Sequence, residues 1–116
     1  MFRYTIKILL INLISLGLSS QIVNASNLEN GKKLFQANCI VCHQNGNNII
    51  IPEKNLQKDV LEQNGINTMD ALIYQITNGK NGMPAFGGRL RDLEIEELAI
   101  YVLQNNFNKK KKRYII

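Results

Sequence analysis

The chain of 116 residues is poor in metal-binding side chains, with one histidine and two cysteines. A structural zinc site takes four nitrogen or sulfur ligands, which these three residues cannot supply. The sequence also lacks the apolar–polar alternation of β-strands, so a thioredoxin-like dithiol site, which belongs to a βαβ unit, is not expected. These absences favour an all-α protein with neither a zinc site nor a redox-active dithiol.

An excess of positive charge is also absent from the central part of the chain. The whole chain carries a formal charge of +5, but residues 26–108 contain seven basic and nine acidic side chains. The excess lies in Arg3, in Lys7 and in the basic run 109–113. No basic surface with interspersed aromatic residues remains, so no nucleic-acid partner is expected.

The few cysteines and the histidine are concentrated in one motif, Cys39-Ile40-Val41-Cys42-His43. This C-x-x-C-H pattern is the attachment motif of c-type haem. Each thiol can add to one vinyl group of the haem, and the histidine that follows is then held below the iron as an axial ligand. The alternative, a disulfide between Cys39 and Cys42, would close a very short loop, add little stability and leave His43 without a role.

The N-terminal segment has the pattern of a cleaved secretory signal peptide. Arg3 and Lys7 precede an apolar stretch over residues 8–18, and a cleavage site with small residues ends at Ala25. The stretch is short and interrupted for a membrane span, although an uncleaved N-terminal anchor is the alternative. The predicted organisation is a signal peptide at 1–25, a cytochrome c domain at 26–108 and a basic, disordered tail at 109–116.

Helical spacing of apolar residues predicts four short helices in the domain. They cover residues 28–35, 56–64, 69–78 and 92–106. The expected N-caps are Ser26 or Asn27 for the first helix, Asn67 or Thr68 for the third, and Asp92 for the fourth. Gly31 lowers the helix propensity of the first helix, so it marks either a close crossing by another helix or a tolerated surface glycine. The glycine-rich stretch 80–90 is expected to be irregular.

A second axial ligand would have to come from outside the motif. The candidates are Met69, Met83, a lysine or an open position. Met69 begins a predicted helix, where methionine is more often a core residue. Met83 precedes Pro84 in a glycine-rich loop that can fold closely over a haem. Ligation by His43 and Met83 would raise the reduction potential and fill both axial positions, which favours one-electron transfer over small-molecule catalysis.

Several longer segments match a known family of proteins. They are 30–35, 37–43, 52–56, 58–62 and, most specifically, Asn78-Gly79-Lys80-Asn81-Gly82-Met83-Pro84-Ala85-Phe86-Gly87-Gly88-Arg89-Leu90. Through these segments the chain resembles the cytochrome c6 family, the soluble photosynthetic members of the class I c-type cytochromes. The resemblance covers nearly all of the chain from residue 26 to about Asn106.

The resemblance implies a class I cytochrome c fold, with about four short helices and irregular loops around one covalently bound haem c. In this fold the first and last helices cross. It implies that Cys39 and Cys42 form the thioethers and that His43 and Met83 are the axial ligands. It also implies that Gln75 approaches the haem.

The resemblance further implies a soluble electron carrier and not an enzyme. Its partners would be cytochrome f of the cytochrome b6f complex and photosystem I, and Arg89 matches a family arginine associated with reaction at photosystem I. The place would be the thylakoid lumen, in a plastid or a cyanobacterium, or a cyanobacterial periplasm. After signal cleavage the protein would not span the membrane. The alternative for Arg89 is an ordinary surface arginine without a functional role. The alternative for Gln75 is an amide on the surface of a helix.

Two alternative functions stay open at this point. One is another class I c-type cytochrome that carries electrons to a terminal oxidase. The other is a haem enzyme or sensor with an open axial site, although the chain has no second histidine as an acid–base group and no room for an output domain.

The chain also departs from the family in three places. Gly82 stands where relatives often have alanine, a C-terminal tryptophan is missing, and the basic tail replaces a short end. The tail either attracts an acidic partner or a membrane surface, or reflects drift at an unpacked terminus.

Overall fold

The computed structural model describes the backbone of residues 1–105 and 107, and the side chains of residues 1–9, 25–105 and 107. In this part of the chain the regular elements are helices: α1 (Phe2–Asn38), α2 (Ile40–His43), η1 (Gln44–Gly46), η2 (Pro52–Lys54), α3 (Lys58–Gln63), α4 (Met69–Asn78) and α5 (Asp92–Gln104). Isolated β-bridges join Lys80 to Met83 and Gly87 to Leu90. The expected all-α fold is therefore confirmed, and the predicted tail 109–116 lies outside the described residues.

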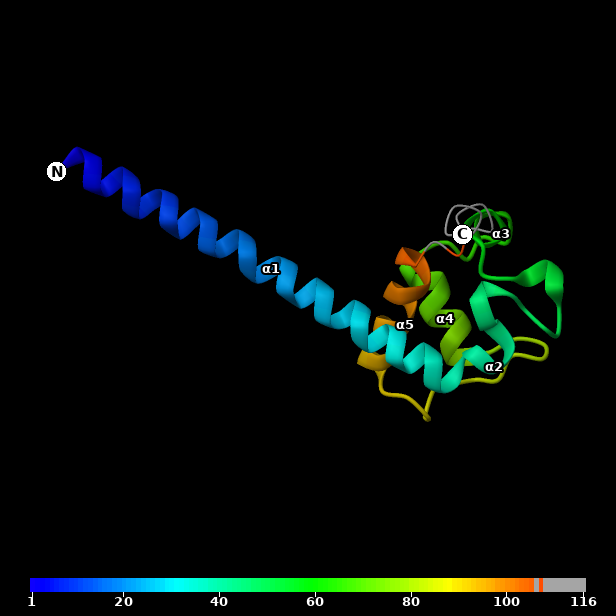
Figure 1. Ribbon diagram of the computed structural model, residues 1–116. Coiled ribbons are helices and arrows are strands. Elements are labelled where there is room, and N and C mark those ends of the chain that lie inside the picture. Colours follow the sequence, from blue (N-terminus) through cyan, green and yellow to red (C-terminus); the bar gives the residue numbers. More distant parts are fainter. Residues whose placement is uncertain (106, 108–116) are drawn as a thin grey trace, which may run out of the picture.

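The C-terminal part of α1 lies across α5, and this crossing brings the two ends of the domain together (Figure 1). Gly31 lies at the contact, where an added methyl group would overlap the carbonyl oxygen of Glu97 and come within 2.9 Å of Tyr101 Cβ. Of the two interpretations of Gly31, the close crossing is therefore the right one. Asn30 Nδ2 donates a hydrogen bond of 3.3 Å to Glu97 Oε1, so the buried carboxylate has a polar partner.

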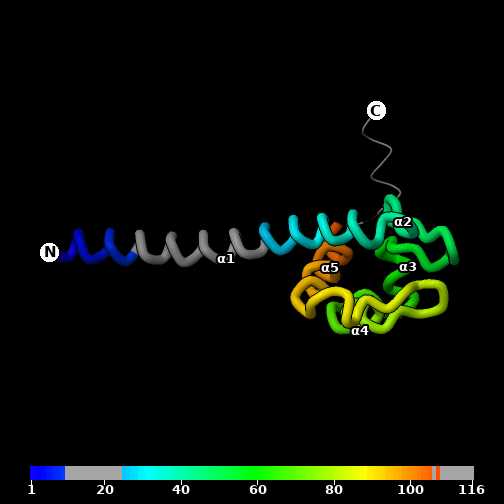
Figure 2. Tube along the Cα trace, turned by 90° about the horizontal axis from the view of Figure 1, so that it is seen from below, coloured from blue at the N-terminus to red at the C-terminus, as the bar shows by residue number. Residues whose placement is uncertain are grey.

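The hydrophobic core forms where α1 and α4 pack against α5, which lies between them (Figure 2). It consists of Phe35, Leu61, Leu72, Ile76, Phe86, Ile95, Leu98, Ala99 and Val102. Leu72 and Ile76 lie one turn apart on α4, as the apolar spacing predicts. The loops that follow α2 and α4 leave the core on the same side, and the cavity described below lies between them.

The predicted helix bounds are right for α4. This helix has the predicted limits, Thr68 Oγ1 accepts a hydrogen bond of 3.3 Å from the Ala71 N–H, and Gly79 ends the helix.

The predicted cap of the last helix is wrong, and the predicted cap of the first helix, expected after signal cleavage, is not formed in the full chain. In the full chain α1 runs through Ser26 and Asn27, because the residues before them continue the helix. The N-cap of α5 is Arg91 and not Asp92. Its backbone N–H donates a hydrogen bond of 2.8 Å to the Glu94 carboxylate, which turns back as in a capping box. The side-chain and backbone hydrogen bonds from Arg91 lower the pKa of Glu94.

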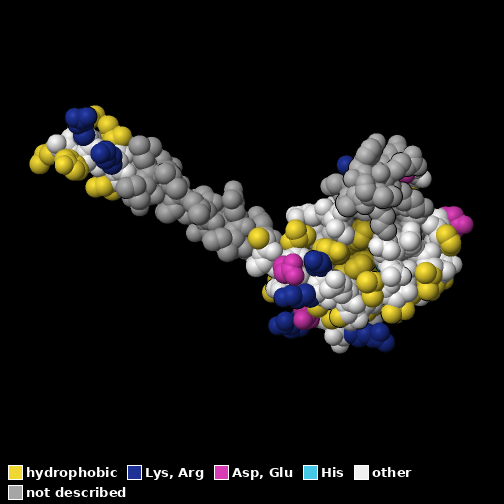
Figure 3. Space-filling model, in the orientation of Figure 1, with side chains coloured by type: hydrophobic (Ala, Val, Ile, Leu, Met, Phe, Trp, Pro, Cys, Tyr) yellow, Lys and Arg dark blue, Asp and Glu magenta, His cyan; other side chains and the backbone are white. Residues whose placement is uncertain are grey.

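The N-terminal end of α1 exposes hydrophobic side chains beside basic ones (Figure 3). The large apolar residues exposed there are Met1, Phe2, Tyr4, Ile6, Ile8 and Leu9. They contribute nothing to the core of the domain. Among the helices of the described residues, we find none that is both long and apolar enough for a membrane crossing.

Candidate haem site

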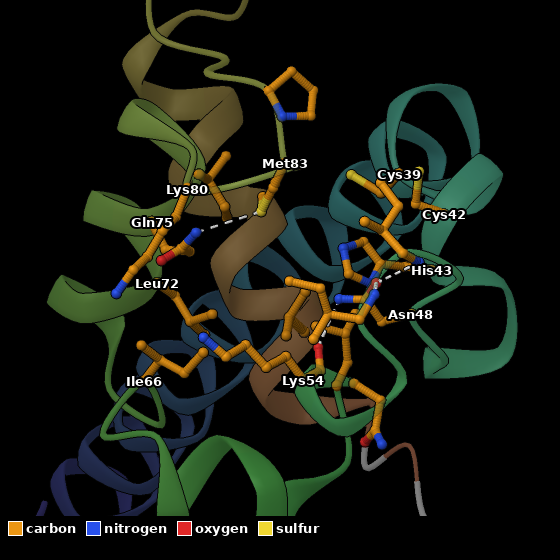
Figure 4. Close-up of a pocket in the computed structure, with 18 of the residues that line it drawn as sticks. Cys39, Cys42, His43, Asn48, Lys54, Ile66, Leu72, Gln75, Lys80 and Met83 are labelled. Carbon is orange, nitrogen blue, oxygen red and sulfur yellow. Dashed lines mark hydrogen bonds between the residues drawn. The ribbon is translucent and has the colours of Figure 1, made fainter.

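The C-x-x-C-H motif lies at the junction of α1 and α2. The Cys39 N–H donates to Phe35 O at 2.9 Å, and the His43 N–H donates to Cys39 O at 2.8 Å, so helical hydrogen bonding continues through the motif. Positions three and four apart on a helical turn share a face. The two thiols and the imidazole accordingly line one cavity, on the same side of it (Figure 4).

The two thiols are free and half-buried. Burial, with a smaller contribution from Cys42, raises the pKa of the Cys39 thiol from 9.0 to about 11. A redox-active dithiol needs a thiolate with a lowered pKa. The environment of Cys39 is therefore unlike that of an exchanging dithiol.

A backbone carbonyl orients the ring of His43. The Nδ1 atom lies 2.9 Å from Asn47 O. Since a carbonyl oxygen only accepts, Nδ1 carries the proton in this contact and Nε2 keeps its lone pair. This is the arrangement of metal-binding histidines, in which the second ring nitrogen donates to an outer partner and Nε2 is left to bind the metal.

The loop after α4 brings Met83 to the other side of the cavity (Figure 4). Gly79, with φ 66° and ψ 176°, lies in a region open essentially to glycine alone, and it turns the chain sharply at the end of α4. Lys80 and Met83 then exchange backbone hydrogen bonds of 3.1 and 3.0 Å. Gln75 Nε2 lies 3.6 Å from Met83 Sδ, so α4 also contacts the sulfur. Met69 packs against the core and does not line the cavity.

The chemistry of the cavity fits a haem. Most of the wall is apolar, and the apolar residues include Leu56, Ile66, Leu72, Ile76, Phe86 and Leu98. Lys54 and Lys80 add positive charge to the lining, which suits the two carboxylates that a haem carries. An imidazole and a thioether sulfur on facing walls are a ligand set of haem iron. The residues present can therefore hold a c-type haem.

Five of the six residues singled out in the sequence line this cavity: Cys39, Cys42, His43, Gln75 and Met83. Arg89 does not line it; it is exposed in the turn after Phe86, where its N–H donates to Phe86 O at 3.0 Å. A surface position is where a residue for partner contact would have to be.

Asn48, which the sequence pattern did not single out, organises the loop beside the motif. Its side-chain oxygen accepts hydrogen bonds from the N–H groups of Ile50 and Ile51 at 3.0 and 2.9 Å, and its amide donates to Lys54 O at 2.9 Å. These bonds fold the loop along the cavity. The tendency of asparagine to bond the backbone two residues ahead was the signal that could have identified it.

Comparison with known proteins identifies the class and the family. The family described as "Cytochrome C oxidase, cbb3-type, subunit III" matches residues 26–102. Cytochrome c6 of Pyropia yezoensis is 59% identical over 87 residues, which cover 75% of this chain and 79% of that protein. Cytochrome c6 of Bumilleriopsis filiformis is 58% identical over 81 residues, which cover 70% of this chain and 94% of that protein.

The structure of cytochrome c6 from the diatom Phaeodactylum tricornutum matches with a TM-score of 0.66 at 49% identity, over 68% of this chain and 93% of that chain. The fold and these matches define a class I c-type cytochrome. Within that class, the chain belongs to the cytochrome c6 family. It is an electron carrier and not an enzyme, which removes the haem-enzyme alternative, and membership implies a c-type haem.

Proposed function

We propose that the protein is a soluble one-electron carrier of photosynthetic electron transport, which takes electrons from cytochrome f of the cytochrome b6f complex and delivers them to photosystem I. It holds one haem covalently through Cys39 and Cys42, with His43 and Met83 as axial ligands. The observation that carries this proposal is the convergence of these four residues on one cavity from two separate parts of the chain (Figure 4).

When bound, a haem would supply a single reversible change of charge, and the residues of the chain would hold and orient it. His43 Nε2 and Met83 Sδ would occupy both axial positions and leave none for oxygen or peroxide. Asn47 O orients the imidazole and Gln75 contacts the Met83 sulfur, so each of the two side chains that would bind the iron has a partner that restrains it. Thioether ligation also raises the reduction potential, as a carrier to an oxidised acceptor requires.

We also propose that residues 1–25 are removed as a signal peptide and that the domain works in the thylakoid lumen of a plastid or cyanobacterium, or in a cyanobacterial periplasm. Two observations support cleavage after Ala25. The exposed apolar and basic residues at the start of α1 lie outside the core, and the family match begins at residue 26. Amino-terminal sequencing of the exported protein tests it; a first residue other than Ser26 contradicts this cleavage site.

The haem ligands are tested by absorbance spectra of the exported protein, oxidised and reduced, with and without carbon monoxide. We expect a low-spin c-type spectrum with a sulfur-to-iron charge-transfer band, and no change with carbon monoxide, because both axial positions are filled. A high-spin spectrum or ready binding of carbon monoxide contradicts ligation by Met83. Retention of the haem after denaturation in acidified acetone tests covalent attachment.

A second candidate is delivery of electrons to a terminal oxidase, which the description of the matching family favours. Arg89→Glu separates the two. If Arg89 contacts photosystem I, this change should slow photosystem I reduction and leave the haem spectrum intact. Lys33→Glu, the same change of charge at an exposed position of α1, is the matched control. Equal rates for both variants contradict the role of Arg89, and faster turnover with an oxidase than with photosystem I favours the second candidate.

A further inference from the structure

We propose that Phe107 is a positioning residue for His43. Its ring presses on the backbone of Gly46 and so holds the turn whose next carbonyl, Asn47 O, orients the imidazole. The inference rests on the proposed role of His43 as an axial ligand. It gives the C-terminal end of the described chain a part in the haem site, although Phe107 does not line the haem cavity.

The first step is the contact between Phe107 and Gly46. Gly46 is buried and has φ 76°, a left-handed conformation that favours glycine. A Cβ placed on it would meet Cβ and Cγ of Phe107 at 2.5 Å. The aromatic side chain therefore lies directly on the glycine backbone. No residue larger than glycine fits at position 46 while the Phe107 ring is there.

The second step is the anchoring of the Phe107 ring. Its centroid lies 5.6 Å from that of Phe35 on α1 and 6.1 Å from that of Tyr101 on α5, the latter edge-on at 82°. Phe35 and Tyr101 also contact each other, with centroids 5.2 Å apart. Aromatic pairs at these separations attract each other in defined orientations. The cluster thus fixes the ring against the α1–α5 crossing.

The third step leads from Gly46 to the imidazole. Gly46 O accepts a hydrogen bond of 2.8 Å from the Leu56 N–H, and the Asn47 N–H donates to Gln44 O at 3.1 Å. Asn47 O, one residue beyond Gly46, is 2.9 Å from His43 Nδ1. The turn is therefore held by Leu56 and by the Phe107 ring. Without the ring the Gly46 backbone gains room to move, and the carbonyl at Asn47 moves with it.

The hydrogen bond at Nδ1 affects the iron ligand directly. An outer partner of a metal-binding histidine fixes the ring and raises the basicity of the other nitrogen. A weaker hydrogen bond from Nδ1 to Asn47 O would make Nε2 less basic. Nε2 would then donate its electron pair to the iron less strongly, which destabilises oxidised iron relative to reduced iron. Loss of the Phe107 ring should therefore raise the reduction potential, a change that loss of packing alone would not produce.

The experiment compares Phe107→Ala with Leu103→Ala in the haem-loaded, processed protein. Leu103 and Phe107 line a second cavity together, and Leu103 also packs on the core, so its truncation is the matched control. We expect Phe107→Ala to raise the potential and to speed hydrogen exchange at His43 Nδ1–H about tenfold, because local opening becomes easier. Leu103→Ala should lower the unfolding temperature and leave both readouts unchanged. Phe107→Tyr, which keeps the ring, should restore both.

If Phe107→Ala and Leu103→Ala change only the unfolding temperature, Phe107 is a packing residue and the inference is wrong. If Phe107→Ala fails to fold, Phe107→Leu replaces it. A smaller rise in the reduction potential then supports the inference, and an unchanged potential contradicts it. The absorbance spectrum of the wild-type protein shows whether a negative result contradicts the role of Phe107 or the proposed function itself. A wild type without His/Met ligation contradicts the function, whereas a normal wild type with unshifted variants contradicts only the role of Phe107.

Discussion

The two walls of the haem cavity are built in different ways. Cys39, Cys42 and His43 lie within five residues, in one helical turn with local hydrogen bonds. Met83 lies in a loop that depends on the backbone of Gly79 and on a contact from α4. The backbone of the first wall is thus set by local structure, and the proposed effect of Phe107 is confined to the turn that orients the imidazole, whereas the position of Met83 is set by tertiary structure. The second wall should be easier to disturb from a distance.

His43→Ala should have the largest effect, because it removes the ligand of the local wall. We expect loss of the low-spin spectrum and a fall in the free energy of unfolding of roughly 4 kcal/mol or more, as for loss of a metal interaction. Free imidazole should restore the low-spin spectrum by filling the space that the side chain leaves. A low-spin spectrum that persists without imidazole would show that another residue binds the iron.

Met83→Ala comes next. We expect the reduced protein to bind carbon monoxide, the reduction potential to fall, and the free energy of unfolding to drop by about 2–4 kcal/mol, as for other methionine truncations. Met69→Ala is the control, because Met69 packs on the core from the start of α4. It should lose stability and still reject carbon monoxide. An unchanged reduction potential in Met83→Ala would show that Met83 is not an axial ligand.

Gly79→Ala tests the tertiary wall without changing a ligand side chain, and the added methyl would overlap the backbone carbonyl oxygen of Met83. The φ of 66° and ψ of 176° at Gly79 disfavour alanine, and the added methyl would lie 2.7 Å from the carbonyl carbon of Pro84. We expect a loss of roughly 1–3 kcal/mol in the free energy of unfolding and a partial high-spin spectrum. Gly65→Ala is the control, with φ 67° and open space around it. If both variants behave alike, backbone strain alone accounts for the effect, and the loop is not displaced.

Gln75→Leu should have the smallest effect. It removes the donor that lies 3.6 Å from Met83 Sδ and keeps a side chain of similar size. We expect the low-spin spectrum to persist, with a small shift in reduction potential and a stability change of about 1 kcal/mol or less. Gln36→Leu, on the exposed part of α1, should leave the potential unchanged. Equal potentials in the two variants would show that the contact with the sulfur has no influence.

The parts of the structure that depend on neighbouring residues could be predicted from the sequence. The limits of α4 follow from its apolar spacing, from Thr68 and from Gly79, and all three are local signals. The convergence of Cys39, Cys42 and His43 follows from helical geometry for the same reason. The close crossing at Gly31 could be stated only as one of two possibilities, because a glycine does not reveal what approaches it.

The remaining features depend on segments that the sequence does not pair. Nothing near Gly46 indicates that Phe107 lies on it, and nothing near His43 names Asn47 O as its partner, because a backbone carbonyl has no sequence signal. The cap of α5 was misassigned because aspartate favours the N-cap, whereas Glu94 satisfies the Arg91 N–H instead. Ser26 does not cap α1 in the full chain, because the residues before it continue the helix.

The crossing of α1 and α5 also sets the order in which the chain can fold. Asn30 and Glu97, which are hydrogen-bonded at the crossing, lie 67 positions apart in the sequence. A chain emerging from its N-terminus cannot close this contact until α5 has followed, and long-range closure is entropically costly before its contacts form. If residues 1–25 direct export, the segment from Cys39 to His43 would therefore stay accessible until α5 has followed. Attachment of a haem to Cys39 and Cys42 at that stage would meet an open chain, before the crossing of α1 and α5 has formed.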